Sequence, residues 1–250
     1  MDTQLRKLFY GFGDIYDDPG ARSFIRAYPD AAGIKGSLLL VNRMNPSIDL
    51  CDWIANEGVD LGRCKRLFRH GVPVFVSAPA GVTVSCGKRR KSVIGSAAVL
   101  ETDNAIAFEA CPPGFRRLGE EDARLFDGIE NDYAENDIAT QTKGNLAEPE
   151  IACFGMFAEG ALAAFADVAK LRGSMFADSY SLANIFTVRR FRRQGFATAL
   201  LRGILQAYPD KHFYYTAQPA TNIASVRSAQ ACGFAPVGET TVYQFTEDRG

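Results

Sequence analysis

The stretch RRFRRQGFATALLRGILQAY, from Arg189 to Tyr208, places a basic, glycine-bearing turn at the start of a helix. It follows SLANIFTV, Ser181 to Val188, an apolar run that predicts a β-strand. The first amides of a helix lack partners within the helix, and the helix dipole favours negative charge at that end. A glycine in such a turn allows the backbone to approach a ligand closely. The stretch therefore predicts a phosphate-binding turn between a strand and a helix.

The composition is typical of a globular protein. The chain has 250 residues, of which 47% are hydrophobic and 23% charged, enough for one large domain or two small ones. A formal net charge of −1 argues against a general polyanion binder. The six cysteines include no C-x-x-C pair, so we expect reduced thiols and no metal site. Because no apolar run approaches the roughly 20 residues of a membrane span, and no signal segment is apparent, we expect a cytoplasmic protein without membrane contact.

The first hundred residues predict a mixed α and β region without a recognisable catalytic motif. A helix is expected over residues 49–57, because Leu50, Trp53 and Ile54 recur at helical spacing. Two further short helices are predicted over residues 21–27 and 60–70. Strands are predicted over residues 37–43 and 92–100, and a hairpin over residues 72–87.

Strands and helices alternate through the second half of the chain. The basic turn follows the carboxyl end of a strand, where ligands of open sheets usually bind. We place a soft boundary near residues 104–114, which divides the chain into regions 1–107 and 108–250. Predicted strands cover residues 105–110, 150–169, 181–188, 212–218 and 237–245, with helices beginning near residues 120 and 195 and a helix over residues 222–233.

Two motifs of this second half resemble the central motifs of the GCN5-related N-acetyltransferases (GNATs). The pyrophosphate signature of that family is Arg or Gln, two residues, Gly, one residue, and Gly or Ala. Arg192, Gly195 and Ala197 match it. The second motif is an Asn that opens a helix ending in Gly-Phe, and Asn222 opens such a helix here.

The resemblance covers roughly residues 108–245, because FRRLGEEDARLF (115–126) also resembles the opening strand and first helix of the family. It implies an α/β fold with a mixed sheet, of the GNAT acyl-CoA-binding type, preceded by an extra mixed α/β region. It also implies an enzyme that moves an acetyl group from acetyl-CoA to a primary amine of a small molecule or protein. The amine would attack directly in a ternary complex.

The resemblance also implies a cofactor site. Consecutive amides from Arg193 to Thr198 would hold the pyrophosphate of coenzyme A. Main-chain groups of Phe186 and Val188 would pair with the pantetheine arm, and the N–H of Val188 or a neighbour would hold the oxyanion. The predicted cofactor-binding residues are Phe186, Thr187, Val188, Arg192, Arg193, Gln194, Gly195, Phe196, Ala197, Thr198, Asn222 and Ser225.

Simpler roles exist for some of these residues. Asn222 would serve equally well as the N-cap of the helix that it opens. Each arginine of the turn could equally be a solvated surface side chain, rather than a ligand of the 3′-phosphate of coenzyme A.

The resemblance fails at one position that bears on catalysis. Many family members carry a tyrosine seven residues after the Asn as general acid, and Ala229 stands there instead. The strand before the turn carries no acidic side chain that would act as a base. Weak candidates for proton transfer are Glu159, Asp178, Tyr180, Tyr215 and His212, each of which also has a structural interpretation.

The middle of the chain is acidic. Residues 111–187 carry 6 basic against 13 acidic side chains, a net charge of −7. Eight of the acids fall in and just after one predicted helix: Glu120, Glu121, Asp122, Asp127, Glu130, Asp132, Glu135 and Asp137. In the family this region borders the acceptor, so its field would attract a cationic amine. A solvated helix face explains the pattern as well.

Three alternatives remain open at this stage. The second half could be a sensor or interaction module that binds acyl-CoA without efficient catalysis. The basic turn and the KRRK segment, Lys88 to Lys91, could form a nucleic-acid patch, although the near-neutral net charge disfavours it. The first hundred residues could determine acceptor specificity, form a homodimer surface, or be a decayed copy of the same fold.

Overall fold

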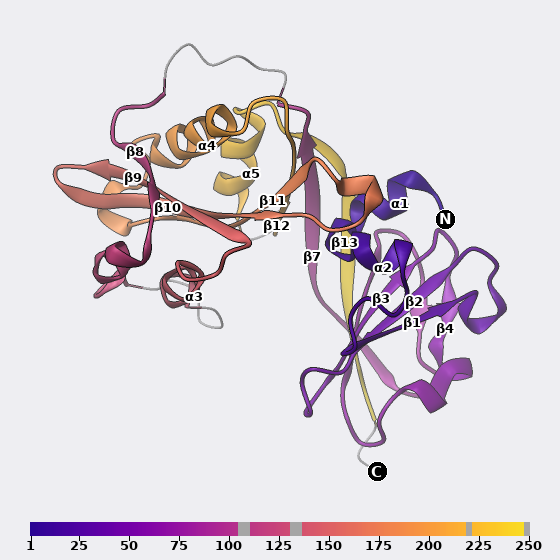
Figure 1. Cartoon of the computed structure of the whole chain (residues 1–250). Helices are drawn as coiled ribbons and strands as arrows, with labels where there is room; N and C mark the ends of the chain where they lie inside the picture. The colour runs from indigo at the N-terminus through magenta and orange to yellow at the C-terminus, as the bar shows by residue number, and fades with distance from the viewer. Residues whose placement is uncertain (105–110, 131–136, 219–221, 248–250) are drawn as a thin grey trace.

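One large mixed sheet runs through the whole molecule (Figure 1). The structure is a computed structural model that describes residues 1–104, 111–130, 137–218 and 222–247. Within these residues, 11 strands form the sheet in the order β1-β2-β3-β5-β13-β7-β12-β11-β10-β9-β8, and β4 pairs with β6 in a second, two-stranded sheet.

The strands have the following bounds. They are β1 (Ile25–Pro29), β2 (Leu38–Asn42), β3 (Asp49–Ile54), β4 (Val59–Asp60), β5 (Val74–Pro79), β6 (Val84–Ser85), β7 (Arg90–Thr102), β8 (Phe115–Leu118), β9 (Ile151–Ala158), β10 (Ala161–Lys170), β11 (Ser179–Thr187), β12 (His212–Ala217) and β13 (Ala235–Thr246).

The helices are mostly short, and many are 3₁₀ turns. The α-helices are α1 (Thr3–Leu8), α2 (Gly13–Asp17), α3 (Ile138–Asn145), α4 (Phe196–Ala207) and α5 (Ile223–Gln230). The 3₁₀ helices are η1 (Tyr10–Phe12), η2 (Ala31–Gly33), η3 (Leu61–Leu67), η4 (Glu120–Phe126), η5 (Ser174–Phe176) and η6 (Arg189–Phe191).

The carboxyl-terminal half packs helices on both faces of its strands. Apolar residues of α4 and α5 cover one face, and α3 and η4 cover the other (Figure 1). The strands β11 and β12 run parallel, but they pair only over Ser179–Leu182 and His212–Tyr215. Their carboxyl ends are therefore not hydrogen-bonded to each other, which leaves an opening in the sheet just before α4.

The amino-terminal half repeats this strand arrangement. Here β1, β2 and β3 are antiparallel neighbours, and β3 then pairs with β5 in parallel. The parallel pairing again covers four residues of each strand, Asp49–Asp52 and Val74–Ser77. This topology favours the interpretation of the first hundred residues as a second copy of the fold.

The two halves exchange strands at their junction. The strand β7 comes from the amino-terminal half, yet its residues Ala98–Thr102 pair with β12. Reciprocally, residues Thr240–Phe245 of β13 pair with β5. The two exchanged strands also pair with each other along their length. Each half thus completes the sheet of the other.

This exchange makes a prediction about the two regions. A fragment of residues 108–250 lacks β7, so both β12 and β13 lose a neighbouring strand. We expect the fragment alone to show no cooperative thermal unfolding, because unpaired backbone groups and apolar faces stay exposed. Co-expression with residues 1–107 should restore a soluble complex. A cooperatively folded 108–250 fragment, measured by circular dichroism, would contradict the prediction.

Several predictions about local structure were wrong. The segment predicted to be helical over 49–57 forms β3, and residues 21–27 form no helix but lead into β1. Residues 72–87 do not form a hairpin, because β5 pairs with β3 and β13, whereas β6 pairs with β4. The short helix predicted over residues 60–70 is present as the 3₁₀ helix η3, Leu61–Leu67, and Asp60 belongs to β4. The predicted strand at 105–110 lies outside the described residues.

Candidate functional site

The basic turn adopts a strained backbone that ends in an open helix terminus. Arg193 and Gly195 both have left-handed backbone angles, with φ of 62° and 83°. Gly195 is the N-cap residue of α4, and no side chain of the described residues caps this terminus. Because the first helical amides cannot pair within the helix, those of Phe196, Ala197 and Thr198 are available to a ligand. This geometry supports an anion site at the start of α4.

A cavity of about 370 Å³ lies against this helix terminus. It is lined by Ile185, Phe186, Thr187, Phe191, Arg192, Arg193, Gly195, Phe196, Ala197, Thr198, Asn222, Ala224, Ser225 and Ser228. Ten of the twelve residues predicted to bind the cofactor are in this set, and Val188 and Gln194 are not. We call this cavity the α4 cleft. Sequence reasoning missed Ser228, although it follows Ser225 at helical spacing.

The main-chain N–H and C=O groups of β11 that face the cleft are not those of the residues that we predicted. The N–H of Val188 donates to the carbonyl of Ala163 on β10 at 2.9 Å, so of the two options that we expected for the oxyanion donor, Val188 or a neighbour, the neighbour remains. Main-chain groups alternate in direction along an antiparallel strand, so those of Phe186 also face β10. The groups of Thr187 and Ile185 face the cleft instead.

The arginine side chains of the turn lie in different places. Arg192 donates from Nε to the carbonyl of Thr187 at 3.0 Å, and its guanidinium lies 5.5 Å from the ring centre of Phe186. The guanidinium of Arg190 packs over Phe191, whereas Arg193 lines the cavity. Arg192 and Arg193 are therefore the arginines placed to meet a phosphate.

The other wall of the cleft comes from α5. Asn222 accepts the amide of Ser225 at 3.3 Å and so caps this helix. The hydroxyl of Ser225 is hydrogen-bonded to that of Tyr215, at the carboxyl end of β12. Ala229, which stands where a tyrosine acid was expected, is fully buried in the same apolar core as Tyr215.

The candidates for proton transfer occupy different places. Asp178 pairs with Lys211 at 2.8 Å, and this ion pair lowers the pKa of Asp178. Tyr180 lies near the amino end of β11, against Tyr208. Glu159 is in the turn between β9 and β10 and does not line the cleft. His212 is bonded to Glu101 at 3.0 Å. Only the Tyr215 hydroxyl contacts a residue that lines the cleft.

Several acids of the predicted acceptor side have local partners. Asp122 makes two 2.7 Å bonds with Arg116, which hold the pKa of that carboxyl below its usual range. Lys143 pairs with Asp127 at 2.6 Å. Asp137 caps α3 through Thr140, so its pKa is also lowered. Asp132 and Glu135 lie outside the described residues. The acidic segment is thus partly structural.

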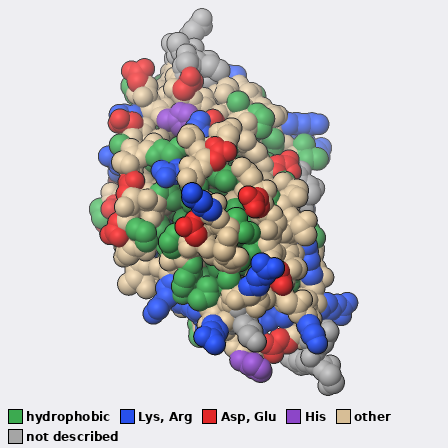
Figure 2. Space-filling view, turned by 90° about the vertical axis from the view of Figure 1, so that its right-hand side faces the viewer, with side chains coloured by type: hydrophobic (Ala, Val, Ile, Leu, Met, Phe, Trp, Pro, Cys, Tyr) green, Lys and Arg blue, Asp and Glu red, His purple; other side chains and the backbone are tan. Residues whose placement is uncertain are grey.

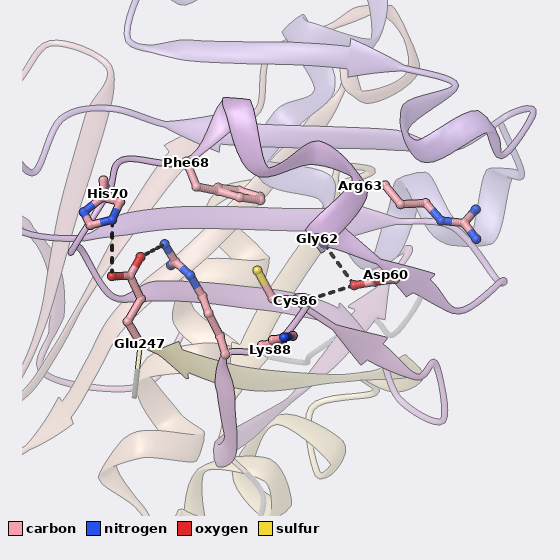
Figure 3. Close-up of a pocket in the computed structure, with 10 residues that line it drawn as sticks. Asp60, Gly62, Arg63, Phe68, His70, Cys86, Lys88 and Glu247 are labelled. Atoms are coloured by element: carbon pink, nitrogen blue, oxygen red, sulfur yellow. Dashed lines mark hydrogen bonds and ion pairs between the residues drawn. The ribbon is translucent and has the colours of Figure 1, made fainter. Parts of the chain in front are cut away.

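A larger cavity, of about 850 Å³, lies in the amino-terminal half (Figure 3). Its two acidic residues, Asp60 and Glu247, have local hydrogen-bond partners. Asp60 accepts the amides of Gly62 and Gly87, each at 2.9 Å, and Glu247 accepts from Arg89 at 2.9 Å. The Asp60–Gly87 bond ties the strand β4 to the turn before β7, and the Arg89–Glu247 bond ties this turn to the residue after β13. The cavity adjoins no glycine turn at the start of an α-helix, so it does not resemble a site for a pyrophosphate.

The amino-terminal half also lacks a counterpart of the α4 cleft. The strand β3 is followed by a short link to β4 instead of a basic turn and a helix. Trp53 is fully buried at this point, and its indole donates to the carbonyl of Glu57 at 2.9 Å. Among the described residues, the geometry of an anion site is therefore found in the carboxyl-terminal half, at the start of α4.

The face of the molecule in Figure 2 carries acidic and basic side chains side by side. A nucleic-acid surface would be dominated by Lys and Arg, so this face does not favour one. No helix among the described residues has the length and apolar character needed to cross a membrane. Within the same residues, no cluster of three or more His, Cys, Asp or Glu side chains is suited to hold a metal ion.

Comparison with known proteins identifies the class of this domain. Residues 115–234 match the Acetyltransferase (GNAT) family, and this part of the chain is a GNAT domain. A search among curated proteins finds no match.

Solved structures share the fold over the whole chain. A putative GNAT-family acetyltransferase from Novosphingobium aromaticivorans has 17% identity and a TM-score of 0.57, with 99% of this chain and 100% of that chain covered. A GCN5-related N-acetyltransferase from Kribbella flavida has 13% identity and a TM-score of 0.60, with 100% and 97% covered. A tandem GNAT protein from the clavulanic acid biosynthesis pathway has 15% identity and a TM-score of 0.53, with 96% and 94% covered. At these identities the likeness concerns the fold.

Proposed function

We propose that the α4 cleft binds acetyl-CoA and that the protein transfers the acetyl group to a primary amine. The observation that carries the proposal is the uncapped terminus of α4 after the left-handed Gly195. It lies beside strands β11 and β12, which stop pairing before their carboxyl ends. A pyrophosphate fits the helix terminus, and the pantetheine arm fits the unpaired edge of β11.

In this proposal the donor is held largely by main chain. The amides of Phe196 to Thr198 bind the pyrophosphate, and Arg192 and Arg193 add charge-assisted bonds. The cleft-facing groups of Ile185 and Thr187 pair with the amides of pantetheine. One of their N–H groups then stabilises the oxyanion that forms on the thioester carbonyl.

The reaction joins the amine nitrogen to the acetyl carbon and breaks the carbon–sulfur bond. The protonated amine first gives one proton to water, and the nitrogen gives a second proton to water as the amide forms. The departing thiolate gains one proton. We assign this protonation of the thiolate to Tyr215, the hydroxyl that contacts the cleft through Ser225, and water then reprotonates Tyr215. The products are an acetamide and free coenzyme A.

The acceptor is proposed to be a cationic amine in a cytoplasmic setting. Residues 111–187 carry a net charge of −7 from 6 basic and 13 acidic side chains. Acids without close partners would attract such a substrate. Neutralising Glu120 and Glu121 should therefore raise KM for a cationic acceptor more than for a neutral one.

A second candidate is an acyl-CoA sensor without efficient turnover. Buried Ala229 favours it, because the usual acid is absent at that position. Both candidates bind coenzyme A, and only the first releases free thiol.

The test combines binding with turnover. Coenzyme A at 100 times its Kd should stabilise the protein by about 2.7 kcal/mol, seen as a rise in Tm. Thiol release from acetyl-CoA should then be followed across a panel of amines. Stabilisation without thiol release would favour the sensor. No stabilisation at millimolar coenzyme A would contradict both candidates.

A further inference from the structure

A buried carboxylate on β10 has no part in the proposed chemistry. Asp167 is 2% exposed. Its Oδ2 accepts three hydrogen bonds, from Thr142 Oγ1 at 3.2 Å, Asn145 Nδ2 at 2.7 Å and Asn184 Nδ2 at 2.7 Å. Its Oδ1 is also buried, and it has no hydrogen-bond partner among the described residues.

The three donors join two separate elements. Thr142 and Asn145 belong to α3, which covers the face of the sheet opposite α4. Asn184 belongs to β11 and has a left-handed φ of 51°. At this point the register between β10 and β11 shifts, as in a β-bulge. Asp167 thus ties the bulge of β11 to α3, the helix that covers the face of the sheet opposite α4.

No cation compensates this carboxylate among the described residues. Burial raises the pKa of Asp167, and the hydrogen bonds from Asn145 and Asn184 oppose that shift. The titratable group beside it is the thiol of Cys153 on β9, whose pKa is itself raised by burial. A buried acid of this kind costs stability. A role in positioning would account for an oxygen acceptor on which three hydrogen-bond donors converge.

We infer that Asp167 is a positioning residue for β11, the strand whose edge is proposed to bind the pantetheine arm of coenzyme A. Its carboxylate fixes Asn184 in the bulge, and the bulge sets the direction of the next residues, Ile185 to Thr187. Of these residues, Ile185 and Thr187 present their main-chain groups to the α4 cleft, so the carboxylate acts on coenzyme A binding without touching coenzyme A. The inference rests on the proposed function, because it concerns the groups assigned there to pantetheine.

The link can be cut with little change to the backbone. Asn184→Gly removes the amide donor, and glycine adopts a left-handed φ without strain. We expect the Kd for coenzyme A to rise about tenfold, because a hydrogen bond to a charged group holds the bulge. The matched control is Glu159→Gly, another left-handed residue, with φ of 53°, in the β9–β10 turn. It should leave the Kd unchanged.

Asp167→Asn tests the oxygen acceptor apart from the negative charge, because the variant keeps an acceptor oxygen and removes the charge. An asparagine keeps an oxygen where three donors converge and places its amide at the unpaired Oδ1 position. We expect the Kd for coenzyme A to stay within about twofold, because the bulge remains held. Burial raises the folded-state pKa of Asp167, so the native state loses stability as pH rises from the ordinary pKa of aspartate towards the raised pKa. Asp167→Asn should therefore raise Tm at neutral pH, and this gain should shrink as pH falls towards the ordinary pKa of aspartate.

Failure of the inference differs from failure of the proposed function. If the wild type binds coenzyme A and Asn184→Gly binds it equally well, the inference is overturned. If the wild type does not bind coenzyme A, the proposed function is wrong, and hydrogen exchange decides the inference. Asn184→Gly should then speed amide exchange over residues 184–187 at least about tenfold relative to Glu159→Gly. Equal exchange in the two variants would overturn the inference.

Discussion

Gly195→Val is expected to abolish the stabilisation of the protein by coenzyme A. Gly195 has a φ of 83°, and a Cβ built there meets no protein atom within 4 Å because it faces open space beside the cleft. A branched side chain would occupy the space where backbone approaches phosphate. Loss of two N–H bonds to a charged phosphate, at about 1.5–3 kcal/mol each, raises the Kd at least about 100-fold.

The control for this variant is Gly160→Val. Gly160 has a φ of 74° and equally open surroundings, but it lies in the β9–β10 turn away from the cleft. A non-glycine residue with left-handed angles costs about 1–3 kcal/mol at either position. Both variants should therefore lose stability, and only Gly195→Val should lose the rise in Tm with coenzyme A. An equal rise in both variants would refute the assignment of the α4 cleft.

Tyr215→Phe is expected to lower kcat by about 100-fold if Tyr215 protonates the departing thiolate. The Kd for coenzyme A should change little, because the phenyl ring keeps its place in the core beside α5. Steady-state thiol release and calorimetry on the same protein measure the two quantities. The loss should be smallest for an acyl donor whose thiol leaving group is more acidic, since such a group needs less protonation.

Tyr214→Phe is the matched control for the hydroxyl. Tyr214 is the preceding residue of β12, so its side chain points to the opposite face of the sheet, where it stacks on Tyr10. It should retain wild-type kcat. If Tyr215→Phe also retains it, the proton comes from water, and Tyr215 has only a structural role with Ser225.

Much of the candidate site could be predicted because its signals are local. A left-handed glycine before a helix and an Asn that caps a helix are properties of a few consecutive residues. Gly195, Asn222 and Ser225, which these signals single out, line one cavity. Which main-chain groups of β11 face the cleft was not predictable, because this depends on which residue of β10 pairs with Val188.

The amino-terminal half shows where local pattern misleads. Leu50, Trp53 and Ile54 have helical spacing, yet they lie on β3. This strand is held by β2 on one side and β5 on the other, and Trp53 and Ile54 are both fully buried. Tertiary pairing overrides a local preference of a few tenths of a kcal/mol per residue.

By itself, the sequence determined the glycine turn that we propose binds phosphate, the helix that follows it and the family of the carboxyl-terminal domain. These features need only neighbouring residues, because backbone angles and helix termini are set over a few positions. The tertiary structure alone decided the exchange of β7 and β13 and the hydrogen bonds that converge on Asp167. It also decided that the main-chain groups of Thr187 face the cleft. Those features join residues far apart in the chain, and no local pattern encodes which distant strand or side chain will face them.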